Sequence, residues 1–227
     1  DVNHMVCTFQ THTTNIRRVC HGDGGKGIVC ERGYTDVDGL VTDDKELCLV
    51  CFFADCVPLY FVDPKHGAIG LAHSGWRGTV AGMGRRMAER MEQEFGTRVQ
   101  DLVAAVGPSI CQDCYEVSEE VAEQFRQMEA SISGSRELLQ ELTAQKAYPH
   151  RQILRPGKEA GKYQLDLWLA NLLILRAAGI PLAQIQVTDV CTCCNRDYLF
   201  SHRASQGKRG NLAAFLMMRD SDGNLDA

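Results

Sequence analysis

The stretch that decides the fold is FFADCVPLYFVDPKHGAIGLAHSGWRGT, which runs from Phe52 to Thr79. It contains two short apolar runs, VPLYFV and AIGLA, separated by the turn-forming sequence DPKHG. Both runs are rich in Val, Ile, Leu and aromatic residues and are short enough to be buried strands. We therefore predict a hairpin. It would bring Cys56, just before the first strand, and His73, just after the second, to the same edge of a sheet.

The composition of the whole chain limits the classes of function. Of the 227 residues, 44% are hydrophobic and 23% are charged, which is ordinary for a globular domain with a real core. The net charge of −5 gives no electrostatic case for nucleic acid or an anionic membrane as a partner. No apolar run reaches the roughly 20 residues that a membrane span needs.

Eleven cysteines are a high and odd number, so they cannot all pair within one chain. Several lie in strand-like runs of a chain that is not dominated by loops, which favours free thiols in a reducing compartment. The opening DVNHMVCTFQTH also lacks the basic-then-apolar pattern of a signal peptide. We therefore expect a cytoplasmic protein.

Strand and helix patterns alternate along the chain. Beside the hairpin, strand patterns lie at 4–12, where the strand would end at His12, and at 47–53, 101–107, 185–190 and close to the C-terminus. Helix patterns lie at 80–95, from Val117 to Met128, and after the capping residue Asp166, whereas 129–164 reads as a polar surface excursion with one short helix. These patterns predict an α+β fold in mixed layers.

The first helix pattern has an apolar face made by Val80, Met83, Met87, Met91 and Phe95. These residues follow the helical period of 3.6. We interpret the methionine stripe as core packing rather than as a metal or cofactor site.

Three residues that border predicted strands suit a catalytic metal: His12, Cys56 and His73. A catalytic zinc commonly has three protein ligands and a water, and one thiolate with two imidazoles is an appropriate donor set. Copper is also compatible with these donors. The alternatives are that Cys56 is a nucleophile with His73 as its base, or that both are ordinary core residues.

A second group of cysteines has less regular spacing. Cys111 and Cys114 form a CQDC motif, and Cys191, Cys193 and Cys194 lie in VCTCCN. CxxC together with CxC is an imperfect match to structural zinc sites, so a second metal site and free thiols both stay open.

From Thr8 to Met218 the chain resembles the YfiH-like laccase-domain family, also described as multicopper polyphenol oxidoreductase-like and as purine nucleoside phosphorylases. The resemblance lies in the motifs FQTH, DVDGLVT, ADCVPL, AHSGWRGT, GPSICQDCYEV and DYLFSHRASQGKRGNLAAFL. It implies a YfiH-like fold, a sandwich of mixed β-sheets flanked by helices. We expect residues 1–227 to form one such domain. It would lack the Arg- and Gly-rich segment that usually precedes the QTH motif in members of the family.

The resemblance also implies that His12, Cys56 and His73 hold a single metal, for which we expect zinc. It implies phosphorolysis of adenosine, inosine or methylthioadenosine, and deamination of adenosine by metal-activated water. Purine nucleosides and phosphate are then the partners, with a monomer or small homo-oligomer as the assembly. We assign catalytic roles to Cys56, His73 and Arg77, and substrate contacts to Arg77, Ser74 and Arg203, although Arg203 also suits a structural ion pair.

Three other functions compete with this prediction. A copper-dependent polyphenol oxidase would need several His-rich copper clusters, and seven histidines without an HxH motif do not supply them. A cysteine hydrolase would use Cys56 as its nucleophile. A metal-binding module without turnover is the alternative that is not an enzyme.

Overall fold

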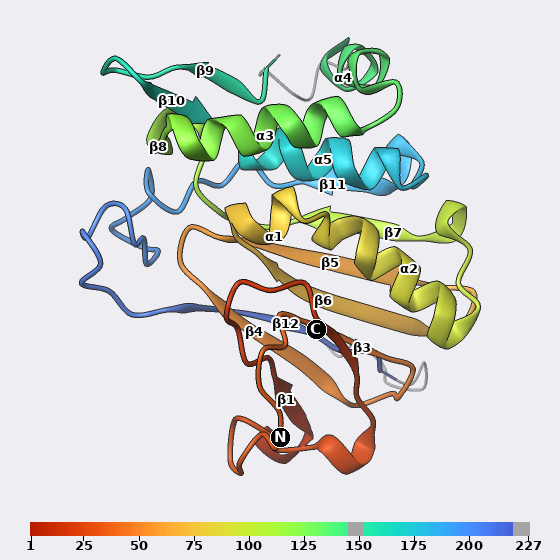
Figure 1. The fold of residues 1–227 in the computed structure, drawn as a ribbon. Helices are drawn as coiled ribbons and strands as arrows, with labels where there is room; N and C mark the ends of the chain where they lie inside the picture. Colours follow the sequence, from red (N-terminus) through yellow and green to blue (C-terminus); the bar gives the residue numbers. More distant parts are fainter. Residues whose placement is uncertain (145–151, 220–227) are drawn as a thin grey trace, which may run out of the picture.

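The computed structural model describes residues 1–144 and 152–219. Within them the chain forms three β-sheets and five α-helices arranged in layers (Figure 1). Helices cover one face of the largest sheet, and a smaller sheet packs on its other face. The predicted α+β sandwich of mixed sheets flanked by helices is confirmed.

The largest sheet has six strands and contains the predicted hairpin. In spatial order the strands are β11 (Ile185–Val187), β7 (Val103–Val106), β5 (Val57–Asp63), β6 (Ala68–Ser74), β3 (Gly39–Thr42) and β2 (Ile16–Arg18). β5 and β6 pair antiparallel, with Val57 opposite Ser74 and Pro58 opposite His73. The hairpin is therefore confirmed, and its open end carries Cys56 and His73. Both strands are almost wholly buried because both faces of the sheet are covered.

Three helices cover one face of this sheet: α1 (Trp76–Val80), α2 (Met83–Phe95) and α5 (Leu167–Ala177). The side chains of Met83, Met87 and Met91 are fully buried there, which confirms the interpretation of the methionine stripe as core. A Cβ at Gly70 of β6 would lie only 2.6 Å from the Cε of Met87. The missing side chain thus lets α2 pack closely on the sheet.

The other face packs against a three-stranded sheet of β1 (Met5–Cys7), β4 (Cys48–Phe53) and β12 (Leu212–Leu216). The apolar run LCLVCFF forms its middle strand, as a continuous buried run predicts. Leu49 of this sheet packs in one core with Leu40 and Leu71 of the large sheet.

The third sheet lies at the far end of the helical layer, at the top of Figure 1. It contains β8 (Glu116–Ser118), β10 (Lys162–Leu165) and β9 (Leu154–Pro156), and it accompanies α3 (Glu119–Ser131) and α4 (Ser135–Ala144). The region 129–164 is therefore more regular than expected, with α4 and two strands in its described part; residues 145–151 lie outside the described residues. Short 3-10 helices occur at Val2–His4, His21–Asp23, Val99–Asp101, Gln112–Cys114 and Leu182–Gln184.

Several predicted boundaries are wrong, and the strand expected at 185–190 already ends at Val187. The helix expected at 80–95 is broken after Val80, because Gly82 has a φ of 75° and begins α2 anew. The strand expected at 4–12 ends at Cys7, so His12 lies in a loop. Val117 belongs to β8 rather than to the helix that follows.

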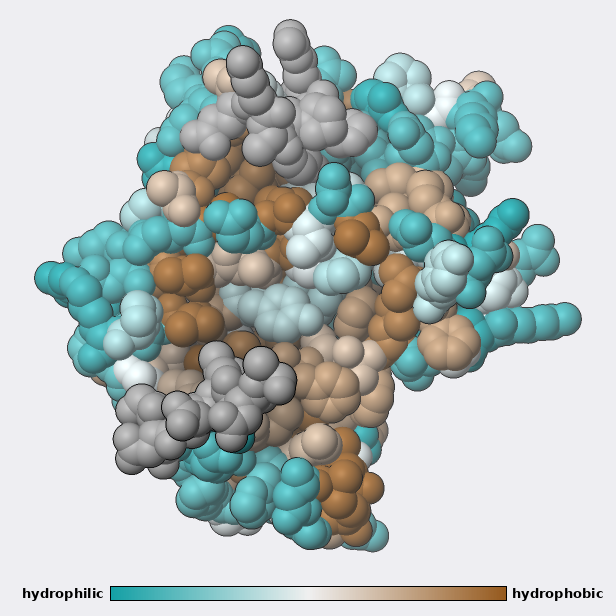
Figure 2. Space-filling view, turned by 180° about the vertical axis from the view of Figure 1, so that it is seen from behind, coloured by the Kyte–Doolittle hydropathy of each residue, from teal (hydrophilic) through white to brown (hydrophobic). Residues whose placement is uncertain are grey.

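Figure 2 shows the back face, where apolar side chains gather across the middle and hydrophilic ones surround them. Large apolar side chains that are exposed include Val103 of β7 and Phe215 of β12. Among the described residues, no helix has both the length and the apolar character that a membrane crossing requires.

The turn of the hairpin is held by Asp63, whose carboxylate is fully buried. One oxygen accepts the backbone N–H groups of Lys65 (2.9 Å) and His66 (3.1 Å), and the other contacts Nδ1 of His66 at 2.7 Å. Burial opposes ionisation of this carboxyl, but the hydrogen bonds from His66 and Lys65 outweigh it and lower the pKa of Asp63.

Asp63→Asn is expected to lower the free energy of unfolding at pH 7 by about 1–3 kcal/mol, because charged hydrogen bonds to the turn are weakened. A lowered pKa gives stability that is present above the unfolded value of about 3.9 and lost as pH falls through the folded value. The difference in free energy of unfolding between the wild type and Asp63→Asn should therefore shrink below about pH 4. Urea unfolding from pH 7 to pH 3 measures it, with the exposed Asp197→Asn as control; a difference independent of pH would contradict the assignment.

Candidate metal centre

His12, Cys56 and His73 meet at the open end of the β5–β6 hairpin. One ring nitrogen of each histidine and the Cys56 Sγ lie within 4.8 Å of one another. The two imidazole rings stand edge to face, with centroids 5.0 Å apart. The three residues differ in exposure: His73 is buried, Cys56 is half-buried and His12 is exposed. The structure thus brings together the three residues for which the sequence predicts a metal.

His12 reaches this point from a loop and not from a strand end. Its backbone φ is 64°, and its N–H donates to Oδ1 of Asp38 at 3.1 Å. The N–H groups of Thr11 (3.1 Å) and Thr13 (2.9 Å) donate to Oδ2 of the same carboxylate. Asp38 therefore sets the path of the loop that delivers His12.

Asp38 also orients His73. Oδ1 of Asp38 lies 2.9 Å from Nδ1 of His73, and both side chains are buried. Burial would raise the pKa of Asp38, but the bonds from His73 and from Thr11 and Thr13 lower it, so the group is a carboxylate. A carboxylate only accepts, so Nδ1 donates its N–H hydrogen bond to Asp38 and Nε2 is the ring nitrogen that would bind a metal.

Electrostatics favour the thiolate of Cys56. Burial raises the pKa of a thiol, yet hydrogen bonds from His12 and His73 together with their charge lower the pKa of Cys56 to about 6. For His73, burial would lower the pKa, whereas Asp38 and Cys56 raise it to about 9. A thiolate with two imidazoles is a donor set that zinc and copper both accept, and the buried carboxylate–histidine pair is the usual support of such a ligand.

The backbone around the three donors is tightly packed. A Cβ at Gly75 would lie 2.9 Å from the Cys56 Sγ and 3.0 Å from Cδ2 of His12, so only glycine fits after Ser74. Asp55, with a φ of 81°, precedes Cys56. Its buried carboxylate accepts the Thr192 hydroxyl at 2.6 Å and the Arg203 N–H at 2.7 Å, which fixes the neighbouring C-terminal loop.

Two cavities flank the donors, with volumes of about 340 Å³ and about 310 Å³. Both are lined by His12, Ala54, Cys56 and Arg209, so the candidate metal centre lies where they meet. The first is also lined by Trp76, Ile110, Tyr115 and Leu167, by the cationic Arg203, and by Asp55 and His202. The second is lined on its far side by polar and aromatic groups that include Gln10, Arg32 and Phe52.

The other predicted site residues do not belong to the group of three donors. Arg203 lines the first cavity, and its guanidinium donates to the carbonyls of Cys114 (3.4 Å) and Glu116 (2.9 Å). Arg77 is exposed and lies over the Trp76 ring, 4.2 Å from its centroid. The hydroxyl of Ser74 is buried in contact with Thr79 and Asn171 and lines neither cavity, so its substrate contact stays a prediction.

Sequence reasoning did not assign a role to Asp38, Tyr115 or Arg209. All three lie inside motifs that carry the family resemblance, DVDGLVT, GPSICQDCYEV and the C-terminal segment. The available signal for Asp38 was a carboxylate directly before a buried strand, since such a group needs donors. Nothing local indicated that the donors would come from the His12 loop.

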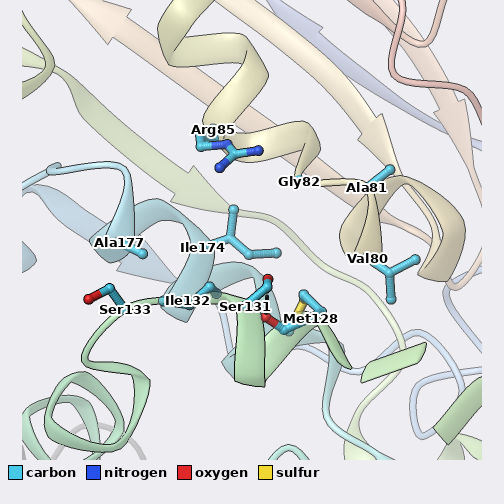
Figure 3. A pocket seen from close by; sticks show the side chains of 10 residues that line it. All are labelled: Val80, Ala81, Gly82, Arg85, Met128, Ser131, Ile132, Ser133, Ile174 and Ala177. Carbon is cyan, nitrogen blue, oxygen red and sulfur yellow. Dashed lines mark hydrogen bonds between the residues drawn. The ribbon is translucent and has the colours of Figure 1, made fainter. Parts of the chain in front are cut away.

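A further cavity of about 240 Å³ lies between α1, α2, α3 and α5 (Figure 3). Its walls are mostly small and apolar, and Arg85 is its one charged lining residue. None of the donors above lines it, so it offers no comparable chemistry.

Asp38→Asn is expected to weaken metal binding at this centre about 10–100-fold, the usual effect of removing a carboxylate that supports a ligating histidine. The metal content per chain is measured at rising chelator concentrations. The variant should lose one metal equivalent at a chelator concentration about 10–100-fold lower than the wild type does. Asp36→Asn is the matched control, because the Asp36 carboxylate lies in the same segment and accepts only from the exposed Thr11 hydroxyl among the bonds described. Equal retention in both variants would contradict the supporting role of Asp38.

Comparisons with known proteins show which family the chain resembles along most of its length. The chain is 34% identical over 222 residues to purine nucleoside phosphorylase YlmD of Bacillus subtilis, covering 97% of this chain and 73% of that protein. It is 32% identical over 204 residues to adenosine deaminase RL5 of an unknown prokaryotic organism, covering 89% of this chain and 71% of that protein. The crystal structure of hypothetical protein YfiH of Bacillus licheniformis superposes with a TM-score of 0.81 at 33% identity, covering 96% of this chain and 76% of that chain.

The family model described as multi-copper polyphenol oxidoreductase laccase matches residues 1–219, which includes every donor of the candidate metal centre. With the resemblance in its motifs and its superposition on YfiH, the chain belongs to this family of YfiH-like laccase-domain proteins.

Proposed function

We propose that this protein is a zinc-dependent enzyme of purine nucleosides. In phosphorolysis, the bond between the purine and the ribose breaks, a bond from the sugar to phosphate oxygen forms, and adenosine, inosine or methylthioadenosine yields the base and (methylthio)ribose-1-phosphate. In deamination, adenosine and water yield inosine and ammonia. The observation that carries the proposal is a candidate metal centre between two cavities, in a chain whose relatives are named for these two reactions.

His12, Cys56 and His73 would hold the zinc, and the donor set fits it. When bound there, zinc supplies a Lewis acid and lowers the pKa of its water toward neutrality. Residues of the chain prepare the ligands for the metal. Asp38 keeps the Nδ1 proton on His73, and the low pKa of Cys56 keeps its sulfur as the thiolate that binding a metal requires.

The first cavity suits a nucleoside beside a phosphate. Trp76 and Tyr115 line this cavity and would contact a purine, and the apolar Ile110 and Leu167 beside them would help to exclude water. Arg203 and Arg209 line the same cavity and would bind phosphate through charge-assisted hydrogen bonds. Arg77, which stacks on Trp76, would add positive charge nearby.

The competing functions fit the site less well. The histidine-containing group that could hold metal in the described residues has two histidines and one cysteine, which is too few ligands for the several coppers of a multicopper oxidase. A cysteine hydrolase would need Cys56 free of metal, and a binding module would not need cavities lined by arginine and aromatic groups.

Purified, metal-quantified protein is expected to convert adenosine to inosine, and with phosphate also to adenine and ribose-1-phosphate, both measured by chromatography. Cys56→Ser should lose one metal equivalent and fall to background in both reactions. Cys30→Ser, which changes an exposed cysteine outside the site, should match the wild type. Absence of product from the wild-type chain, or unchanged product from Cys56→Ser, would contradict the proposal; phenol oxidation with bound copper would favour the oxidase.

Arg209→Ala is expected to raise KM for phosphate about 10–100-fold, since hydrogen bonds to charged groups contribute roughly 1.5–3 kcal/mol. Adenosine deamination, which uses no phosphate, should change far less. Arg196→Ala is the matched control, because Arg196 belongs to the same C-terminal loop but lines neither cavity. Equal losses in both reactions would show that Arg209 is not a phosphate ligand.

A further inference from the structure

The cysteine-rich loops of the chain meet at a second point, away from His12 and His73. Cys111 and Cys114 belong to the loop between β7 and β8, and Cys191 and Cys194 to the turn that follows β11. Their four Sγ atoms all lie within 4.8 Å of one another. The Cys194 Sγ is 3.9 Å from that of Cys111 and 3.5 Å from that of Cys114.

These distances fit one enclosed ion. With Zn–S bonds of about 2.3 Å, tetrahedral geometry places the sulfurs roughly 3.8 Å apart. A disulfide would need about 2.05 Å, far shorter than either separation. A four-iron cluster binds each cysteine to a different iron, which spreads the sulfurs more widely than a single ion does.

The structure also shows which cysteines form the set. The motif Cys191-Thr192-Cys193-Cys194 contributes its first and last cysteine, so the spacing is CxxC with CxxC, and not the CxxC with CxC that the sequence offered. Two CxxC pairs are the usual arrangement of a structural zinc site. Cys193 is half-buried against the core and stands outside the set.

Backbone groups already support the sulfur of Cys191. The N–H groups of Cys111 and Cys194 each lie 3.3 Å from it, and hydrogen bonds of this kind favour a thiolate. The two loops are joined next to it, because Ser109 donates to the Val190 carbonyl and Thr192 donates back to the Ser109 carbonyl. These main-chain bonds bring the two loops together beside Cys191.

We propose that Cys111, Cys114, Cys191 and Cys194 bind one zinc ion that ties the β7–β8 loop to the C-terminal loop. Four thiolates complete the tetrahedral coordination and leave no position for water, so the site is structural. The assignment does not depend on which reaction the His12–Cys56–His73 centre performs.

The ion would stabilise one wall of the first cavity. Tyr115 follows Cys114 directly, and the Arg203 guanidinium lies 5.2 Å from the centre of the Tyr115 ring and donates to the Cys114 carbonyl. Thr192, next to Cys191, binds the carboxylate of Asp55 that precedes Cys56. Loss of the ion should therefore loosen the loop that carries Arg203 while leaving the hairpin intact.

The test is metal content measured by mass spectrometry on the full chain, purified under reducing conditions without chelator. In a Cys56→Ser background one zinc per chain is expected. Adding Cys114→Ser should remove it, whereas adding Cys193→Ser, the neighbouring cysteine, or Cys30→Ser should not. Zinc content unchanged by Cys114→Ser, or lost equally with Cys193→Ser, would overturn the four-cysteine set.

A second measurement covers the case in which Cys114→Ser does not fold. The otherwise intact Cys56→Ser chain, loaded with Co²⁺ in place of zinc, should show the sulfur-to-cobalt charge transfer and the intense visible bands of a tetrahedral thiolate site. Chelation should then speed proteolysis within 188–209. A disulfide among these cysteines, bound iron as isolated, or a chain without metal and with four rapidly reactive thiols would each refute the zinc site.

Discussion

The buried carboxylate of Asp38 is the constraint on which the candidate metal centre depends. This carboxylate accepts hydrogen bonds from the backbone of the loop that carries His12 and from Nδ1 of His73. The backbone carbonyl of Asp38 also accepts the backbone N–H of His73. A buried charge is tolerated only when it is paired and hydrogen-bonded, so the loop and the hairpin end are held to it together. The positions of both histidine donors follow from this one group.

A second buried carboxylate, Asp55, connects the same centre to the end of the chain. The carboxylate accepts hydrogen bonds from the Thr192 hydroxyl and from the backbone N–H of Arg203. The backbone carbonyl of Asp55 accepts the backbone N–H of Ile110. Segments far apart in sequence thereby form the wall of one cavity. The four-cysteine cluster lies between the same segments, so a single region of the fold both lines the first cavity and contains the proposed second metal site.

Elements with strong local signals were predicted well. The β5–β6 hairpin, the buried face of α2 and the cap of α5, where Asp166 accepts the Leu169 N–H at 2.8 Å, each depend on residues close together in the chain. Predictions of element boundaries failed where a contact with a residue distant in the sequence, or a special backbone conformation, ends the element. The strand expected to end at His12 stops at Cys7 because the following loop bonds to Asp38, and the expected helix is interrupted by the left-handed Gly82.

The sequence by itself determined that Cys56 and His73 share one end of a hairpin, because register in a tight hairpin follows from the turn and the alternation of apolar residues. Only the tertiary structure decided that His12 joins them, that Arg209 lies beside them, and that Cys194 rather than Cys193 meets Cys111 and Cys114. These contacts join loops whose paths are set by buried carboxylates and long-range main-chain bonds. Such interactions leave no periodic pattern in the amino-acid sequence.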